Sequence, residues 1–387
     1  MKNVESKGQV SPVTSGRLVS LDAFRGFDMM IIIGFDRVFS ALGRCIYGGD
    51  GGWMAEQMSH PYWFGLSFYD TVFPTFLFIA GISFPFSYAR QREKGVSSLR
   101  IHLSILKRAA ILVMLGWVYN RLFTVGFADL RYGSVLGKIG IGWMIAAMCY
   151  VHFRLLGRIL ICTSLVVVYA VLLNILSAPD FPGASPFSIE GNFIGWLDRM
   201  IMPGKLYQSA FIGGEKVANL CEPSGIFGSF FSSATAMLGV FAGEIVRSER
   251  FSGGRKTIHL LSFAAGLIVA GLCASAFVPI SKKLWTPSFL LCVGGYSAAA
   301  FAVFYWLADV KGWRKWTFFF VVIGVNSITI YLLQRFVDFM GVVKFFLGGV
   351  ASRLPPAEAS LLLACGYLAL SWLLLLFLYR KKVFLKV

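Results

Sequence analysis

The chain has 387 residues, of which 57% are hydrophobic and only 14% are charged, and its formal net charge is +17. Soluble domains contain about 25% charged residues, so this composition excludes an ordinary soluble protein. A charge of +17 could indicate a nucleic-acid-binding protein, but most Lys and Arg residues lie in short loops between apolar segments. We therefore interpret the charge as a signal of membrane topology and expect no nucleic-acid partner.

The polar N-terminal stretch contains no apolar core, so we expect no cleavable signal peptide. Apolar segments of about 20 residues, the length needed to cross a bilayer, then follow one another along the chain. Inside lipid each must be a helix, because only a helix satisfies its own backbone groups there. The sequence predicts an all-α polytopic membrane protein of about ten transmembrane helices, at residues 19–43, 68–89, 104–121, 134–151, 155–176, 227–246, 258–279, 286–308, 317–338 and 359–379.

The distribution of Lys and Arg predicts the orientation of these helices. With the N-terminus in the cytoplasm, the cytoplasmic segments hold 22 Lys and Arg residues and the outer segments hold 11. We therefore expect cytoplasmic tails at residues 1–18 and 380–387 around a membrane domain at 19–379. The domain has two long outer loops, at 44–67 and 177–226, and loops of this length are typical of functional segments.

The first apolar segment carries an unusual number of charges. Asp22 and Arg25 are three residues apart near the cytoplasmic end, where an ion pair on one helix face would explain them. Asp36 lies near the outer end, and a carboxylate at that depth is expected to face a polar cavity, the headgroups being the alternative.

His60 lies in the first outer loop, among aromatic residues and ten positions before Asp70. A lone histidine in a loop is usually only solvated. Imidazole titrates near neutral pH, however, so His60 is also a candidate to accept a proton from an attacking group. Asp36 is expected at the same membrane level.

The second outer loop combines acids and aromatic residues, which suit a sugar, although an ordinary solvated loop has the same composition. Asn326 lies in the middle of the ninth segment, where a hydrogen bond between helices is the simpler explanation and a tunnel lining is the other. Cys45 and Cys221 are the only cysteines expected outside, and they could form a disulfide or remain free. The residues proposed to bind a substrate are Asp70, Asn192, Asp198, Tyr207, Glu222 and Asn326.

Short motifs in order along nearly the whole chain resemble the transmembrane N-acetyltransferases typified by heparan-α-glucosaminide N-acetyltransferase. The resemblance starts at RLVSLDAFRG and continues through HPYWFGLSFYDTVFP. It then includes VLGKIGIGW, WLDRMIMPGKLYQ, EPSGIFGSF, PISKKLWTPSF, VIGVNSITIY and the terminal LYRKKVFLKV.

This resemblance implies transfer of an acetyl group from cytoplasmic acetyl-CoA to the amine of a glucosamine-type sugar outside. The family's proposed catalytic histidine falls on His60, and its functional asparagine near the end of the first span falls on Asp36. The carboxylate is a departure, because it would more naturally orient His60 or bind an ammonium. Gly137 and Lys138 are a second departure, since the family tends to have Gln-Arg there. The family's large N-terminal extension is missing from this sequence, which suggests the inner membrane of a bacterium.

A polyanionic donor inside and a sugar outside predict a tunnel between helices, with the CoA phosphates at the basic inner face and the thioester near His60 and Asp36. The phosphate partners would come from Arg25, Arg90, Lys107, Arg108 and Lys138, although the general basic bias of cytoplasmic loops also explains such residues. His60 could act as a general base or become acetylated itself. We expect no metal, and the family suggests a homodimer. The alternatives are a glycan O-acyltransferase and an amino-sugar secondary transporter.

Overall fold

The computed structural model describes residues 18–385 and confirms an all-α polytopic membrane architecture. Most of the predicted tail at 1–18 and the last two residues therefore lie outside the described part. Eight described helices are long and apolar enough to cross a bilayer: α4 (Phe68–Glu93), α5 (Ser98–Tyr119), α7 (Val135–His152), α8 (Leu155–Ile175), α10 (Ile226–Arg247), α11 (Gly253–Ser275), α12 (Pro287–Tyr305, extended by the π-helical turn η2, Trp306–Val310) and α16 (Pro356–Arg380). A ninth is counted when α13 (Thr317–Gly324) and α14 (Ser327–Phe336), which are bent by 65°, are taken as one span.

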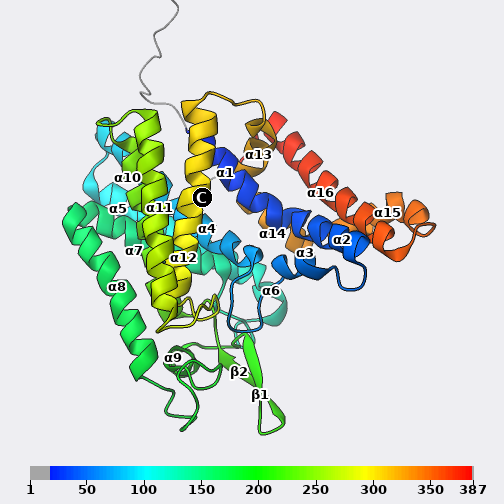
Figure 1. The fold of residues 1–387 in the computed structure, drawn as a ribbon, viewed down its shortest axis with the longest axis horizontal. Helices are drawn as coiled ribbons and strands as arrows, with labels where there is room; N and C mark the ends of the chain where they lie inside the picture. Colours follow the sequence, from blue (N-terminus) through cyan, green and yellow to red (C-terminus); the bar gives the residue numbers. More distant parts are fainter. Residues whose placement is uncertain (1–17, 386–387) are drawn as a thin grey trace, which may run out of the picture.

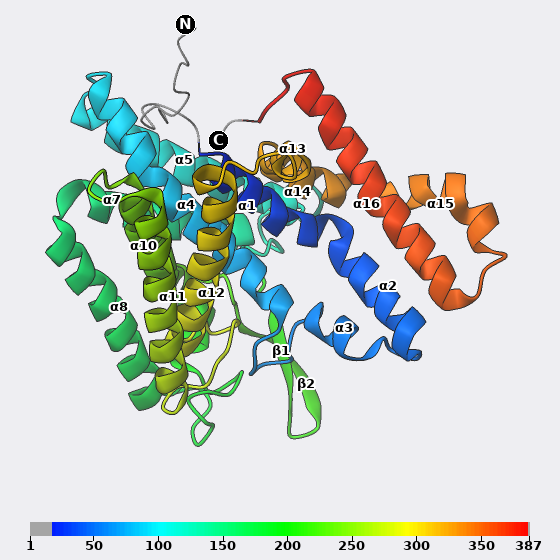
Figure 2. The same ribbon diagram turned by 45° about the horizontal axis from the view of Figure 1, so that its top comes forward.

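The first predicted segment is not a straight helix. It consists of α1 (Val19–Met30), a π-helical turn η1 (Ile31–Phe35) and α2 (Asp36–Tyr47), with a kink at Gly34. Gly34 has a φ of 137°, a conformation that favours glycine, and a Cβ there would lie 2.9 Å from the Tyr367 ring of α16. The kink therefore turns α2 away from the axis of α1, as Figure 2 shows. This segment is not among the eight single-helix spans.

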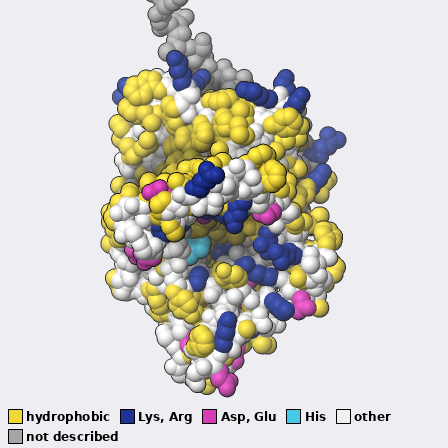
Figure 3. Space-filling view, turned by 90° about the vertical axis from the view of Figure 1, so that its right-hand side faces the viewer, with side chains coloured by type: hydrophobic (Ala, Val, Ile, Leu, Met, Phe, Trp, Pro, Cys, Tyr) yellow, Lys and Arg dark blue, Asp and Glu magenta, His cyan; other side chains and the backbone are white. Residues whose placement is uncertain are grey.

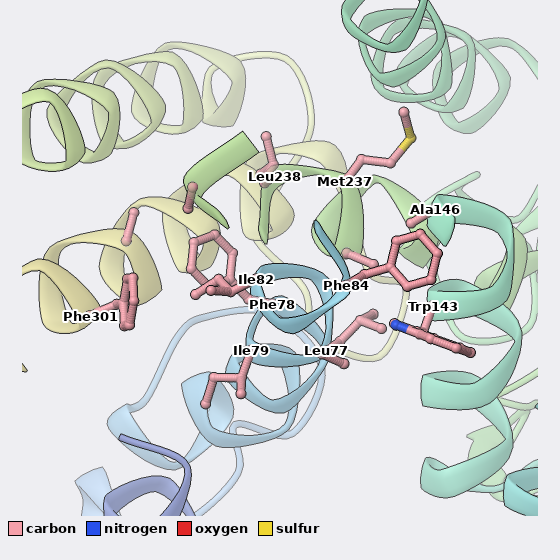
Figure 4. Packing of buried hydrophobic residues seen from close by; sticks show 14 of the residues in the cluster. Leu77, Phe78, Ile79, Ile82, Phe84, Trp143, Ala146, Met237, Leu238 and Phe301 are labelled. Carbon is pink, nitrogen blue, oxygen red and sulfur yellow. The ribbon is translucent and has the colours of Figure 1, made fainter. Parts of the chain in front are cut away.

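The packing of α4 against α10 forms the centre of the main core. Phe78 and Ile82 of α4 and Leu238 of α10 are buried in one apolar cluster, which Figure 4 shows from close by. The two backbones can approach closely because small residues, Gly239 and Gly243, face α4. The loop at 44–67 leads directly into α4 and is therefore attached to this closely packed pair of helices.

The shorter elements are distributed around this core: α3 (Gly52–Gln57), α6 (Leu122–Val125), α9 (Phe193–Ile201), β1 (Gln208–Ile212), β2 (Glu215–Cys221) and α15 (Phe339–Ala351). The strands β1 and β2 form an antiparallel hairpin. Figure 1 shows this hairpin and α9 at one end of the molecule, with the start of α1 and the end of α16 at the other end. Within the described residues, the two long loops therefore gather at one end of the bundle.

Three loops that are far apart in the sequence pack together at that end. The Trp63 indole donates a hydrogen bond to the Phe187 carbonyl at 2.6 Å, which joins the two long loops. The Ser281 hydroxyl donates to the Trp63 carbonyl at 2.7 Å, and the Gly65 N–H donates to the Ile280 carbonyl at 2.9 Å. The loop between α11 and α12 is thereby held against the loop that precedes α4.

Candidate active site

The imidazole of His60 is paired with the carboxylate of Asp70. His60 lies in the loop before α4, and Asp70 lies in the first turn of that helix. The Nδ1 atom of His60 is 2.7 Å from Oδ1 of Asp70, and the Ser67 N–H donates to Oδ2 of Asp70 at 3.3 Å. The Asp70 side chain is 2% exposed and the His60 side chain is 47% exposed. A buried, oriented carboxylate therefore holds a histidine that remains open to a reactant.

This pairing determines which nitrogen of His60 can react. A carboxylate accepts a hydrogen bond, so Nδ1 carries the proton and Nε2 keeps its lone pair in the neutral imidazole. The ring of Tyr69 packs against that of His60, with 4.9 Å between centroids, and limits how the imidazole can turn. The arrangement suits a general base or a nucleophile. Figure 3 shows a histidine within a hollow of the surface, with Lys and Arg side chains around it.

Lys282, from the loop between α11 and α12, is a third member of this cluster. Its Nζ lies 3.2 Å from Oδ1 of Asp70 and 3.4 Å from Nδ1 of His60. Burial lowers the pKa of Lys282, and the charge of Asp70 opposes that effect. In the sequence this lysine belongs to the PISKKLWTPSF motif, and nothing in its spacing connects it to a histidine more than two hundred residues earlier.

A cavity of about 270 Å³ lies between α1, α4, α5, α7 and the bent pair α13–α14. Two of the predicted phosphate partners, Arg25 and Arg108, line it together. The Arg108 guanidinium lies over the Trp143 ring at 4.3 Å, and no group in residues 18–385 hydrogen-bonds its Nε atom. Arg25 lies 3.6 Å from Asp22 and donates to the Ser83 hydroxyl at 3.3 Å, so the expected helix-end pair is present.

The other lining residues are almost all apolar, and their order gives the cavity a direction. From Arg25 the lining follows α1 to Met29 and continues to Ile32 of η1, and on α4 it includes Ala80, Phe76 and Phe73. Phe73 is one helical turn from Asp70, so the cavity extends from the two arginines toward the end of α4 that carries the His60 partner. Tyr331 of α14 also lines the cavity, and its ring stacks on that of Tyr119 of α5 with 4.5 Å between centroids.

The remaining predicted phosphate partners are not among the residues that line this cavity. Arg90 and Lys107 are exposed on α4 and α5. Lys138 is 1% exposed, donates to the Pro223 carbonyl at 2.8 Å and lies over the Trp285 ring at 3.8 Å. The structure thus brings Arg25 and Arg108 together and gives Lys138 partners from the loop that precedes α10 and from the loop that follows α11.

Most of the residues predicted to bind a substrate in the second outer loop are buried. Asn192 caps α9 by accepting from the Gly195 N–H at 2.6 Å. Glu222 forms a bidentate pair with Arg131, at 2.6 and 2.8 Å. Asp198 is 1% exposed, and burial, followed by the charge of Glu222, raises its pKa to about 8. Tyr207 is 60% exposed and lies against the Arg131 guanidinium at 4.2 Å.

Two further candidates have distinct surroundings. Asn326 is 2% exposed and donates to the Val383 carbonyl at 3.1 Å, so it joins α14 to the segment after α16. The Oδ1 atom of Asp36 is buried and has no hydrogen-bond partner within residues 18–385, and Asp36 interacts electrostatically with Tyr69. Asp36 is therefore close to the His60 cluster and has an unused acceptor atom.

Cys45 and Cys221 do not form a disulfide in this structure. Cys45 is exposed on α2, whereas Cys221 is buried at the end of β2, and both are free thiols. The two long loops are joined by the hydrogen bond of Trp63 and by apolar contacts instead. Within the described residues, no group of three or more His, Cys, Asp or Glu side chains could hold a metal ion.

Comparison with known proteins confirms the family resemblance. Heparan-alpha-glucosaminide N-acetyltransferase of Homo sapiens is 27% identical over 438 aligned positions, which cover 98% of this chain and 62% of the human protein. The Mus musculus protein of the same name is 25% identical, with 97% of this chain and 61% of the mouse protein covered. The chain thus spans about three fifths of the length of the curated relatives it matches. No protein-family model matches the chain.

Proposed function

Because the chain is related to the heparan-alpha-glucosaminide N-acetyltransferases over almost its whole length, we propose that it is a membrane-embedded acetyltransferase. The donor is acetyl-CoA, which binds from the cytoplasmic side, and the acceptor is the amine of a glucosamine-type sugar on the opposite side. The observation that carries this proposal is the 2.7 Å pair of His60 and Asp70, toward which an apolar cavity with two arginines extends.

The reaction needs one base at the acceptor end. The neutral amine attacks the thioester carbonyl carbon, a C–N bond forms, and the C–S bond breaks. Nε2 of His60 takes the proton that the amine loses, and the sulfur leaves with the bonding electron pair. The thiolate is then protonated to give CoA with a free thiol. Asp70 keeps the imidazole in the required orientation and stabilises the imidazolium that forms, as a carboxylate does for a catalytic histidine.

The lining of the cavity supports the assignment of the donor. The CoA phosphates are polyanionic, and guanidinium groups bind phosphates through charge-assisted hydrogen bonds. Arg108 has an unused Nε donor among the described residues, and Arg25 lies beside it. The apolar walls suit the pantetheine arm, which would place the thioester near Phe73 and Tyr69. Arg25 and Arg108 are thus our candidates for phosphate binding.

Asp36 is our candidate for contact with the acceptor. Its unpartnered Oδ1 atom can accept a hydrogen bond from an amine or a sugar hydroxyl, and it neighbours Tyr69. Tyr207 offers an exposed ring for an apolar sugar face. We assign four buried residues to the scaffold: Asn192, Asp198, Glu222 and Asn326. The polar atoms of Asn192, Glu222 and Asn326 form hydrogen bonds within the protein.

We propose direct transfer in a ternary complex, because the His60 side chain is about half exposed and can meet a second reactant while Asp70 holds Nδ1. The alternative is an acetylated histidine that passes the group on. Incubation of the purified protein with labelled acetyl-CoA, without sugar, separates the two routes. Direct transfer predicts no labelled protein after rapid quenching, and label on the His60 peptide would require the acetyl-histidine route.

The proposed activity is tested with the purified protein in proteoliposomes, acetyl-CoA on the side of the termini and glucosamine on the other side. Release of free thiol that depends on glucosamine is expected, and N-acetylglucosamine, which lacks a free amine, is the matched control. Equal thiol release with N-acetylglucosamine would indicate O-acylation. Sugar uptake without acetyl-CoA, together with no thiol release, would indicate a transporter and overturn the proposal.

A further inference from the structure

We propose that Lys282 is a positioning residue that keeps the His60 imidazole neutral, and so ready to accept a proton, by sharing the carboxylate of Asp70. The role in catalysis rests on the proposed function. The effect on His60 itself does not, because it is a property of the protein without substrate.

Three polar atoms meet at this site. Oδ1 of Asp70 lies 2.7 Å from Nδ1 of His60 and 3.2 Å from Nζ of Lys282. The Nδ1 atom already carries a proton toward Asp70, so the ammonium 3.4 Å away cannot donate to it. One carboxylate oxygen therefore receives two donors, and the two donors face each other without a bond between them.

The charges then determine which form of His60 is favoured. Asp70 alone would stabilise an imidazolium, because an opposite charge favours the charged form. Lys282 neutralises that carboxylate and adds a like charge beside the ring, and both effects favour the neutral imidazole. The Lys282 and Asp70 side chains are 20% and 2% exposed, so solvent screens the interaction between these two groups only weakly.

The loop geometry fixes Lys282 in this place. Its carbonyl accepts from the Trp285 N–H at 3.1 Å, and the preceding Ser281 is bonded to the Trp63 carbonyl in the His60 loop. The neighbouring Lys283 is different, because its ammonium donates to the Tyr62 carbonyl and lies over the Tyr62 ring at 5.4 Å. The chain therefore contains a matched pair of adjacent lysines, of which only the first contacts the catalytic pair.

The other charged groups near His60 do not replace Lys282. Tyr69 packs on the imidazole from α4, and Asp36 and Arg37 of α2 both interact with Tyr69, with opposite charges. Lys283 is within electrostatic range of Asp70 but is bonded elsewhere. Lys282 is the cation that reaches both members of the pair among the described residues.

This arrangement has a consequence for turnover. After His60 accepts the proton of the amine, an imidazolium lies beside an ammonium, and their repulsion favours release of the proton to solvent through the exposed side of the ring. The same ammonium disfavours a protonated acceptor amine near His60. Lys282 would thus favour the neutral amine, which is the nucleophilic form.

The test measures the charge state of His60 directly. Diethyl pyrocarbonate modifies neutral imidazole, so modification of the His60 peptide in the full-length protein, followed by mass spectrometry from about pH 5 to 8, gives its pKa without any substrate. Lys282→Met is expected to raise that pKa by about one unit, the typical size of a single charge effect. Lys282→Gln removes the charge but keeps a donor, and it is expected to behave in the same way.

Two variants are the controls, and the His102 peptide is the internal reference. Lys282→Arg keeps the charge and is expected to leave the His60 pKa unchanged, as is Lys283→Met. An unchanged pKa in both Lys282→Met and Lys282→Gln would overturn the proposal, as would an equal shift in Lys283→Met. In the active protein the acid limb of the kcat/KM profile should move to higher pH in the same variants. A shifted pKa in a protein without acetyl transfer would overturn the proposed function and leave this inference intact.

Discussion

The two ends of the proposed reaction path are built differently. At the end of the outer loops, Asp70 contacts both His60 and Lys282. Hydrogen bonds between the loops hold these three side chains in place. At the other end, Arg25 and Arg108 lie in a mostly apolar cavity, and Arg108 has a donor that no described residue uses. A polar group that the protein leaves unused is costly unless a ligand binds it. The comparison suggests that the first end is organised for chemistry and the second end is organised for binding.

Removal of the proposed base, His60, is expected to give the largest effect and tests whether this end of the path carries out the chemistry. His60→Ala is expected to lower kcat by about 10² to 10⁴, the range for loss of a general base, because it removes the side chain that is proposed to take the proton of the amine. Thiol release from acetyl-CoA in the presence of glucosamine measures it. His259→Ala is the control, because His259 is exposed on α11. Near-normal turnover in a folded His60→Ala protein would contradict the assignment.

Asp70→Asn tests whether the carboxylate orients the imidazole. The amide keeps the size of the side chain but can hold the wrong tautomer of His60, and it does not stabilise an imidazolium. We expect a fall in kcat of about 10²-fold or more, by analogy with the loss seen when a catalytic histidine loses its carboxylate. A KM for acetyl-CoA that stays within about twofold of the wild-type value would show that the donor end is intact.

The donor end is tested by two adjacent residues on α5. Arg108→Gln is expected to raise the KM for acetyl-CoA about tenfold, the effect of losing one charge-assisted hydrogen bond, with a smaller change in kcat. Lys107→Gln is the matched comparison, because Lys107 is exposed and does not line the cavity. Equal effects of the two substitutions would show that only the general positive charge of this face matters, and that the cavity has no specific role.

The sequence was sufficient for the fold class and for the helices with uninterrupted apolar runs, because a bilayer imposes one length and one secondary structure on each span. It also identified His60, Asp36, Arg25 and Arg108 as candidates. It could not give the kink at Gly34, where a positive φ coincides with close packing against the Tyr367 ring of a distant helix. Nor could it give the pairing with Lys282, because that contact depends on how three loops pack. For Asn192 and Glu222, polarity predicted contact with a substrate. In the structure the Asn192 amide caps α9 and the Glu222 carboxylate pairs with Arg131, which supports our assignment of both residues to the scaffold.

Substitution of Asp198 is expected to have the smallest effect of the four. It tests whether a buried, protonated acid stabilises the second long loop. Its pKa is raised to about 8 by burial and then by Glu222, whereas an unfolded chain has an Asp pKa of about 4. The folded state therefore binds the proton more tightly, so this contribution to stability is complete below about pH 4 and is lost as the pH rises toward 8. Asp198→Asn should flatten the fall in the apparent thermal unfolding midpoint between pH 5 and 8, measured in detergent. Asp129→Asn, at an exposed position paired with Lys205, should keep the wild-type slope. If both variants keep that slope, Asp198 is ionised in the folded protein. The ion pair of Arg131 with Glu222 and the hydrogen bond from Lys138 to the Pro223 carbonyl must then stabilise the loop without help from a proton.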